Sequence, residues 1–371
     1  MTAARPVVVV AVHPDRRAEM LAAEDLAWLS EFAAVEVEDF HGPSTIDGEP
    51  EPDDAAEQRL GTLAQAADAL VVAHGAPRVS ARVLDAAPGV TFVGELEGDR
   101  FSGRIDVAAA QARDVLVVDT THGSSWPVAE WALALAVLGL RDASRFIRRF
   151  QAHDLIASGG RDEPHRTGNR ELSDRRVGLI GFGHIAWRLV ELLRPFRVTV
   201  VAYDPYTPRE LAEATGVTLG TLDAVMASSD VVICLAPLTA ASRGLVQERH
   251  LRLLRPGSTF VNVSRGAVVD THGLEVVAKE GQVSFCLDVL DPEPVPVDHP
   301  LRDLPNVLLT PHLAGTTEET RQRFFHLMVA ELNRHFSGLE PRAQLTSRVL
   351  ASRHGTRSAQ TAAPTQTAPP R

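Results

Sequence analysis

The sequence has few cysteines and no long apolar run. The only cysteines in 371 residues, Cys234 and Cys286, each lie in a short apolar segment. This placement suits reduced thiols in a core and argues against a disulfide framework or a cysteine-based metal site. The longest apolar stretch, Ala132 to Leu140, is far shorter than the ~18 to 20 residues that cross a bilayer. We therefore expect no membrane span.

Positive charge is also scarce. The chain has 37 Lys and Arg against 48 Asp and Glu, a net charge of -11, which argues against a surface that binds nucleic acid. The residues before Val7 lack the charged region, apolar core and cleavage site of a signal peptide, so we expect an unexported, cytoplasmic protein. With 44% hydrophobic and 23% charged residues, the composition is that of an ordinary globular protein, and the length predicts roughly two domains.

Short Val, Ile and Leu runs alternate with segments of helical period, a pattern that predicts an α/β fold with parallel strands. Four strands are expected in the first part, at Val7 to Val12, Ala69 to Ala73, Thr91 to Val93 and Leu116 to Val118. After a helix at Val128 to Leu140, six more are expected, at Val177 to Ile180, Thr199 to Tyr203, Val231 to Leu235, Thr259 to Asn262, Val283 to Asp288 and Val307 to Leu309. Six buried strands in the second part predict a doubly wound, dinucleotide-type (Rossmann) sheet.

Two polar segments interrupt this pattern. Ala157 to Arg170 is rich in Gly and Arg and predicts a loop. From Val349 to Arg371 the chain has almost no apolar residues and cannot offset the entropy of ordering, so a disordered tail is predicted over residues 349–371. A last amphipathic helix is expected before it, at about Glu318 to Phe336.

A glycine motif follows the strand at Val177 to Ile180. Gly181 permits a tight turn, Gly183 lets the main chain approach a pyrophosphate, and Ala186 is small enough for close helix packing. On these residues alone, a glycine-rich turn that binds nothing explains the motif equally well.

Asp204 ends the next strand, 21 residues after Gly183, which is near the interval expected for a carboxylate that binds the ribose of NAD. The acid would repel the 2′-phosphate of NADP, although Arg209 could favour it, so NAD is expected over NADP. The alternative for Asp204 is a structural role in an Asp-Pro turn.

Three polar side chains follow later strands: Arg265, Glu293 and His312. Carboxyl ends of strands converge on one crevice in a doubly wound sheet, so these residues could meet. Arg265 could bind a carboxylate through its fork, His312 could exchange a proton with a substrate oxygen, and Glu293 could stabilise the imidazolium. Each alone is more simply a surface charge or a loop residue. After an earlier strand, His74 and Gly75 could offer N–H groups to a substrate carboxylate, with an ordinary turn as the alternative.

Together these motifs resemble the D-isomer-specific 2-hydroxyacid dehydrogenase family, from about Val7 to Leu345. The resemblance is carried by Gly178-Leu-Ile-Gly-Phe-Gly-His-Ile, Leu235-Ala-Pro-Leu-Thr239, Phe260-Val-Asn-Val-Ser-Arg-Gly-Ala-Val-Val-Asp270 and Thr310-Pro-His-Leu-Ala-Gly. It implies NAD-dependent interconversion of a 2-oxo acid and a D-2-hydroxy acid, with Arg265 anchoring the carboxylate, His312 as proton donor and acceptor, and Glu293 tuning His312. The residues then expected to contact the cofactor are Gly181, Gly183, His184, Ile185, Asp204, Ala236, Pro237, Ser242, Val263, Ser264, Arg265, Asp288, His312 and Gly315.

The resemblance also implies a domain order. A discontinuous, flavodoxin-like α/β substrate domain would comprise residues 1–124 and 313–348, and the NAD-binding domain residues 125–312. A homodimer built on the long helix that begins near Trp126 is implied as well, and no metal is expected. The family includes NAD(H)-sensing corepressors, so a binding protein with little turnover is the alternative function. The loop Gly94 to Arg104 is longer and more charged than the family's usual substrate loop, which leaves the identity of the acid open.

Overall fold

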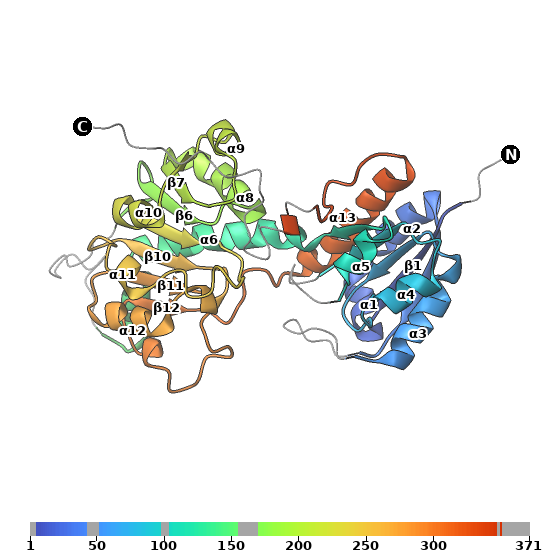
Figure 1. Cartoon of the computed structure of the whole chain (residues 1–371). Coiled ribbons are helices and arrows are strands. Elements are labelled where there is room, and N and C mark those ends of the chain that lie inside the picture. Colours follow the sequence, from blue (N-terminus) through green and yellow to red (C-terminus); the bar gives the residue numbers. More distant parts are fainter. Residues whose placement is uncertain (1–4, 43–51, 98–103, 155–169, 347–348, 351–371) are drawn as a thin grey trace. The chain divides into compact units, whose positions relative to one another are not determined.

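The computed structural model describes residues 5–42, 52–97, 104–154, 170–346 and 349–350. These form two compact units, one from the described parts of Met1–Ser124 and Thr316–Leu350, the other from those of Ser125–Gly315 (Figure 1). The loop predicted at residues 157–170 falls almost wholly outside the described residues, as does the tail after residue 350. Val349 and Leu350, which we placed in the disordered tail, are helical and pack against the core of the first unit, so this part of the tail prediction was wrong.

The first unit is built on a five-stranded parallel sheet. Its strands are β1 (Val7–Val12), β2 (Ala34–Asp39), β3 (Ala69–Val72), β4 (Phe92–Glu95) and β5 (Leu116–Asp119), in the order β2-β1-β3-β4-β5. Its helices are α1 (Pro14–Met20), α2 (Ala23–Phe32), α3 (Asp54–Leu63), α4 (Ala81–Ala86), α5 (Val107–Gln111) and α13 (Glu318–Phe336). Alternate side chains of the strands point to opposite faces, so one apolar cluster contains α3, α4 and α5 and the other contains α2 and α13.

Strand β2 was not expected from the sequence. Three of its six residues, Ala34-Val-Glu-Val-Glu-Asp39, are acids, so the apolar run typical of a buried strand is absent. The strand nevertheless pairs with β1 along six residues, from Val7↔Ala34 to Val12↔Asp39. It lies at the edge of the sheet, where polar side chains can reach water.

The second unit holds a seven-stranded parallel sheet. Its strands are β6 (Arg176–Ile180), β7 (Thr199–Tyr203), β8 (Thr218–Leu219), β9 (Val231–Cys234), β10 (Thr259–Asn262), β11 (Ser284–Leu287) and β12 (Val307–Leu309). The order β12-β11-β10-β9-β6-β7-β8 is that of a doubly wound dinucleotide-binding sheet. Its helices are α6 (Ser125–Leu140), α7 (Ala143–Gln151), α8 (His184–Leu193), α9 (Arg209–Ala214), α10 (Leu222–Ser228), α11 (Glu248–Leu251) and α12 (Thr271–Lys279).

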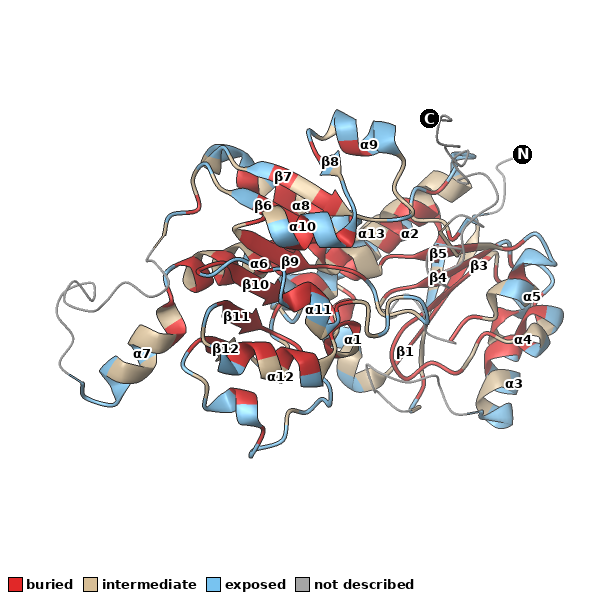
Figure 2. Cartoon of the chain, turned by 60° about the vertical axis from the view of Figure 1, so that its left-hand side comes forward, coloured by how far each residue is buried: buried red, intermediate tan, exposed pale blue. Residues whose placement is uncertain are grey.

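Two apolar clusters cover the two faces of this sheet. One contains α6, α8 and α9, and the other contains α10, α11 and α12, where the rings of Phe260 and Phe285 stand 6.1 Å apart. Figure 2 shows the strands largely buried and several helices exposed on their outer sides. The predicted α/β class with parallel sheets is therefore confirmed. Within the described part of this unit, the one strand that was not predicted is the two-residue edge strand β8.

This arrangement decides where chemistry can occur. All paired strands of each sheet run parallel, so the loops that follow them gather at one edge. The strand order reverses between β6 and β9 in one sheet and between β1 and β3 in the other, so the chain leaves the two strands of each pair towards opposite sides of the sheet. Doubly wound sheets bind ligands at such points. Among the described residues, no helix is long and apolar enough to cross a membrane.

Candidate active site

The glycine loop lies at the β6/β9 switch point. Gly181 has a φ of +94°, and a Cβ on it would stand 2.8 Å from the main chain of Ala236, so both the conformation and the space require glycine. A Cβ on Gly183 would meet nothing within 4 Å, so open space adjoins the loop. Helix α8 begins at His184, and the N–H groups of the first turn of an α-helix, here that of Ile185, point out of its N-terminus. Open space before a helix N-terminus suits a pyrophosphate.

Asp204 ties the loops after β6 and β7 together. One carboxylate oxygen accepts a hydrogen bond from the main-chain N–H of Phe182 at 2.7 Å. The other accepts from the N–H groups of Tyr206 at 2.8 Å and Thr207 at 3.0 Å. The carboxylate thus has the structural role in the Asp-Pro turn that the sequence left open. The oxygen that accepts from Phe182 has a second lone pair, so the carboxylate can still accept from a ribose hydroxyl.

The loop after β9 carries the next expected contacts. Ala236 is buried beside Gly181, and Pro237 follows it. The hydroxyl of Ser242 donates to the carbonyl oxygen of Pro237 and accepts from the N–H of Thr239 at 2.7 Å. Ser242 therefore closes this loop on itself and holds the main chain at the switch point.

The loop after β10 presents Arg265. Its base is buried: the hydroxyl of Ser264 donates to Oδ1 of Asn262 at 2.8 Å, and Nδ2 of Asn262 donates to the carbonyl of Arg265 at 3.2 Å. Val263, beside them, is also buried. The guanidinium of Arg265 is half-buried and donates from Nη1 to the carbonyl of Ser264 at 2.9 Å. The main chain of Arg265 is thus fixed, while most N–H groups of its guanidinium are left for a ligand.

His312 and Glu293 form a pair. Nδ1 of His312 lies 2.7 Å from Oε1 of Glu293, although 19 residues separate them in the chain. The side chains are 31% and 38% exposed, so both are reachable from solvent. His312 has a φ of +53°, an uncommon conformation for a residue other than glycine, and its N–H donates to the carbonyl of Asp288 at 2.9 Å.

Asp288 is the buried support of this pair. Its Oδ1 accepts from the N–H of Leu313 at 2.9 Å and from Nε1 of Trp131 at 3.2 Å, and its Oδ2 accepts from the N–H of Ala314 at 2.9 Å. The hydroxyl of Thr310 also donates to Oδ1. These contacts bracket His312 on both sides and extend to the residue before Gly315. Sequence reasoning expected Asp288 only at the cofactor and missed Trp131, because an indole in an apolar helix has no distinguishing sequence pattern.

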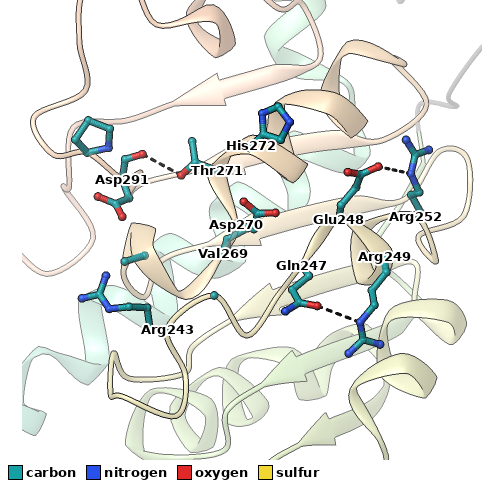
Figure 3. Close-up of a pocket in the computed structure, with 13 residues that line it drawn as sticks. Arg243, Gln247, Glu248, Arg249, Arg252, Val269, Asp270, Thr271, His272 and Asp291 are labelled. Carbon is teal, nitrogen blue, oxygen red and sulfur yellow. Dashed lines mark hydrogen bonds and ion pairs between the residues drawn. The ribbon is translucent and has the colours of Figure 1, made fainter.

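A pocket of about 900 Å³ opens beside these loops, between the segment from Arg243 to Arg252, which includes α11, and the start of α12 (Figure 3). Arg249 and Arg252 line it, and each donates to a neighbouring side chain, Gln247 at 3.1 Å and Glu248 at 2.7 Å. Thr271 donates to the carbonyl of Asp291. The lining contains none of the expected cofactor or substrate residues, and we assign no ligand to it.

His74 and Gly75 lie in the first unit, directly after β3. Both are buried, and Gly75 has a φ of +87°. The carbonyl of His74 accepts from the N–H of His13 at 2.8 Å. Nε2 of His74 lies 3.0 Å from Oε1 of Glu97, a residue that sequence reasoning did not single out.

Comparison with known proteins places these features in a family. Residues 133–314 match the model of the NAD-binding domain of the D-isomer-specific 2-hydroxyacid dehydrogenases. A glyoxylate reductase of Thermofilum pendens is 31% identical over 282 residues, which cover 74% of this chain and 80% of that protein. The chain belongs to the D-isomer-specific 2-hydroxyacid dehydrogenase family.

Other relatives share the family and the fold. A D-3-phosphoglycerate dehydrogenase of Archaeoglobus fulgidus is 30% identical over 273 residues, 73% of this chain and 50% of that protein. The chain thus spans about half the length of the phosphoglycerate dehydrogenases it matches. The crystal structure of a phosphoglycerate oxidoreductase from Rhizobium etli superposes with a TM-score of 0.76 at 23% identity, covering 92% of this chain and 98% of that one, which shows the same fold.

Proposed function

We propose that this member of the 2-hydroxyacid dehydrogenase family is an NAD-dependent oxidoreductase that interconverts a 2-oxo acid and a D-2-hydroxy acid. The observation that carries the proposal is the 2.7 Å contact between His312 and Glu293 beyond the carboxyl ends of β11 and β12. A carboxylate on Nδ1 orients the imidazole and leaves Nε2 to exchange a proton with a ligand, as a general acid and base requires.

The glycine loop fits a nicotinamide dinucleotide. The open space at Gly183, the N-terminus of α8 and the spare acceptor capacity of Asp204 would hold its pyrophosphate and ribose. We propose NAD rather than NADP, because the carboxylate of Asp204 would repel a 2′-phosphate. When bound, the cofactor supplies or accepts the hydride.

The chain's own residues perform the remaining steps. Arg265 binds the substrate carboxylate through the part of its fork that Ser264 does not occupy. His312, whose Nδ1 is engaged by Glu293, gives a proton to the substrate oxygen from Nε2 during reduction and accepts it there during oxidation. Glu293 does not touch the substrate in this scheme, so it is a positioning residue.

The test follows oxidation of NADH and NADPH by the purified chain against glyoxylate, hydroxypyruvate, pyruvate and larger 2-oxo acids. Removing a general acid typically costs about 10² to 10⁴-fold in rate, so His312→Ala should lose that much in kcat and still bind NADH. An exposed histidine outside the pair, His272, gives the matched control His272→Ala, which should keep wild-type turnover. Unchanged turnover in His312→Ala would refute the role of His312 as proton donor and acceptor. NADH binding by the wild type without turnover of any acid would refute the proposed dehydrogenase activity.

We also propose that the protein is a homodimer. Helix α7, which follows α6, exposes Ile147 and Phe150, with 75% of Phe150 accessible. An exposed phenylalanine on an amphipathic helix suits contact with a second chain. Light scattering should give twice the mass of one chain, and Phe150→Ser should lower the measured mass towards that of one chain.

A further inference from the structure

Glu293 lies in a part of the chain that has no regular secondary structure. Residues 291–296 stand between β11 and the short 3₁₀ helix Pro300–Arg302, and they form neither helix nor strand. The side chain of Glu293 is 38% exposed, so holding it in one conformation costs entropy. Its Oε1 nevertheless lies 2.7 Å from Nδ1 of His312. The contact therefore depends on what fixes the main chain of residues 291–296.

Prolines stiffen this segment from within. They occupy positions 292, 294 and 296, and each has a fixed φ. Residues that precede a proline are restricted as well, so Glu293 and Val295 also have little conformational freedom. Because few dihedral angles between its ends are free, contacts at the two ends of the segment set the position of Glu293.

Helix α12 holds the first end. The hydroxyl of Thr271, the first residue of this helix, donates to the carbonyl of Asp291 at 2.9 Å (Figure 3). The helix itself is anchored in the apolar core of the second unit through Leu274 and Val277. The main chain is thus fixed two residues before Glu293.

Arg302 holds the second end. Its Nε donates to the carbonyl of Pro296 at 2.7 Å, and its Nη2 donates to the carbonyl of Val295 at 2.8 Å. The N–H groups of a guanidinium have a fixed planar geometry, so two bonds to consecutive carbonyls fix the direction of the chain as well as its position. The side chain of Val295 packs against the same apolar core. The main chain is therefore also fixed two residues after Glu293.

Arg302 is tied to the core although the residue is exposed. Leu301, directly before it, is fully buried. The N–H of Arg302 donates to the carbonyl of His299 at 3.0 Å, and Nδ1 of the buried His299 accepts from the N–H of Leu301 at 3.3 Å. Arg302 forms no ion pair with any residue that the structure describes. Its guanidinium thus acts on the two carbonyls rather than on an acidic side chain.

We propose that Arg302 is a positioning residue for proton transfer, because its bonds to Val295 and Pro296 keep the carboxylate of Glu293 on Nδ1 of His312. Without the guanidinium, only Thr271 holds the segment, Glu293 turns towards water and the imidazole loses its orientation. The proposal rests on the proposed function only in that His312 exchanges a proton with the substrate.

The pair can be measured in the full chain without cofactor or turnover. An ionised carboxylate only accepts hydrogen bonds, so Glu293 places the proton of a neutral His312 on Nδ1, whereas an imidazole in water carries it mainly on Nε2. Nitrogen-15 NMR shifts of the two ring nitrogens distinguish these tautomers, and His312→Ala identifies the signal. We expect the Nδ1–H tautomer in the wild type and a shift towards Nε2–H in both Arg302→Met and Glu293→Ala.

Two conservative variants and one control make this comparison specific. Arg302→Lys keeps a donor and should restore part of the Nδ1–H population, and Thr271→Val, which releases the first end, should shift the tautomer in the same direction as Arg302→Met. Arg334→Met is the matched control. In the first unit, Nε and Nη2 of Arg334 donate to the carbonyl of Glu340 at 3.0 and 2.8 Å, so the same kind of contact is lost far along the chain from the pair. The tautomer and kcat should not change there.

Kinetics then test whether Arg302 acts through Glu293. At saturating NADH, Arg302→Met should lower kcat by about tenfold or more with little change in the KM of the acid, because a displaced catalytic group can cost up to about 10²-fold in rate. In the Glu293→Ala background, Arg302→Met should have no further effect, whereas a merely structural role would lower kcat in both backgrounds. An unchanged tautomer in Arg302→Met, or additive losses in the double variant, would overturn the proposal. Failure of the proposed function is distinguishable, because the wild type would then reduce no acid while the tautomer still shifts in Arg302→Met.

Discussion

Asp288 provides the sharpest test of how the fold positions His312. The change Asp288→Asn keeps the shape of the side chain and replaces one carboxylate oxygen with an amide NH₂. Oδ1 accepts from Leu313, Trp131 and Thr310, whereas Oδ2 accepts from Ala314. The amide group will therefore turn its nitrogen towards Ala314, where two donors face each other.

The magnitude follows from that geometry. One charge-assisted hydrogen bond is lost and a buried N–H is left without an acceptor, so the free energy of unfolding should fall by about 3 kcal/mol. The segment that carries His312 will shift, and a displacement of ~1 Å in a catalytic group can cost about 10²-fold in rate. We expect kcat to fall by about 10 to 100-fold, while the KM for NADH stays close to its wild-type value.

Urea unfolding and steady-state kinetics measure the two effects. Asp303→Asn makes the same chemical change at an exposed position and should alter neither quantity. The reasoning fails if Asp288→Asn matches the wild type in stability and kcat. A weaker affinity for NADH with normal kcat would instead support the cofactor contact that the family resemblance implies for Asp288.

Three further predictions concern the two sheets. Gly181→Ala should lower stability and abolish NADH binding, because φ at this position is positive and the added Cβ meets the main chain of Ala236. Gly183→Ala should weaken NADH binding and leave stability unchanged, because its Cβ enters open space. Titration with NADH and thermal melts distinguish the two variants. Burial raises the pKa of Glu97 from 4.5 to about 7, so its contribution to stability is present below pH 4.5 and lost as the pH rises through 7. The free energy of unfolding of Glu97→Gln, measured in urea, should therefore exceed that of the wild type by on the order of 3 kcal/mol at pH 8, and the difference should close towards pH 4.5. A difference that does not change with pH would contradict this. Phe285→Ala, in a fully buried strand, should cost about 3 to 5 kcal/mol in the same assay, and a loss below about 1 kcal/mol would show that the site repacks.

Both cysteines illustrate what composition can predict. The apolar runs around Cys234 and Cys286 indicated buried thiols, and both are buried and free of disulfides. Burial raises the pKa of the Cys286 thiol to about 12, so it stays protonated and unreactive at neutral pH. Local sequence is sufficient here because a thiol inside an apolar strand has few other environments available.

Local sequence also determined the strands and the glycine loop. Continuous apolar runs predict buried parallel strands, and Gly181, Gly183 and Ala186 mark the turn into α8, because each of these features depends on residues close together in the chain. The edge strand β2 was missed for the complementary reason. Its acidic side chains are accommodated by solvent at the sheet edge, which only the strand order reveals.

The tertiary structure decided which of the candidate residues interact. His312 and Glu293 are 19 residues apart, and Asp288, Trp131 and Ala314 meet only because β11, β12 and α6 pack together. Likewise, burial raises the pKa of Glu97 to about 7 and lowers the pKa of His74 to about 4, and the sequence gives no sign that these two side chains pair. Desolvation and long-range contact are properties of the packed chain, so the sequence by itself determined the elements and the residue types, and the fold determined their chemistry.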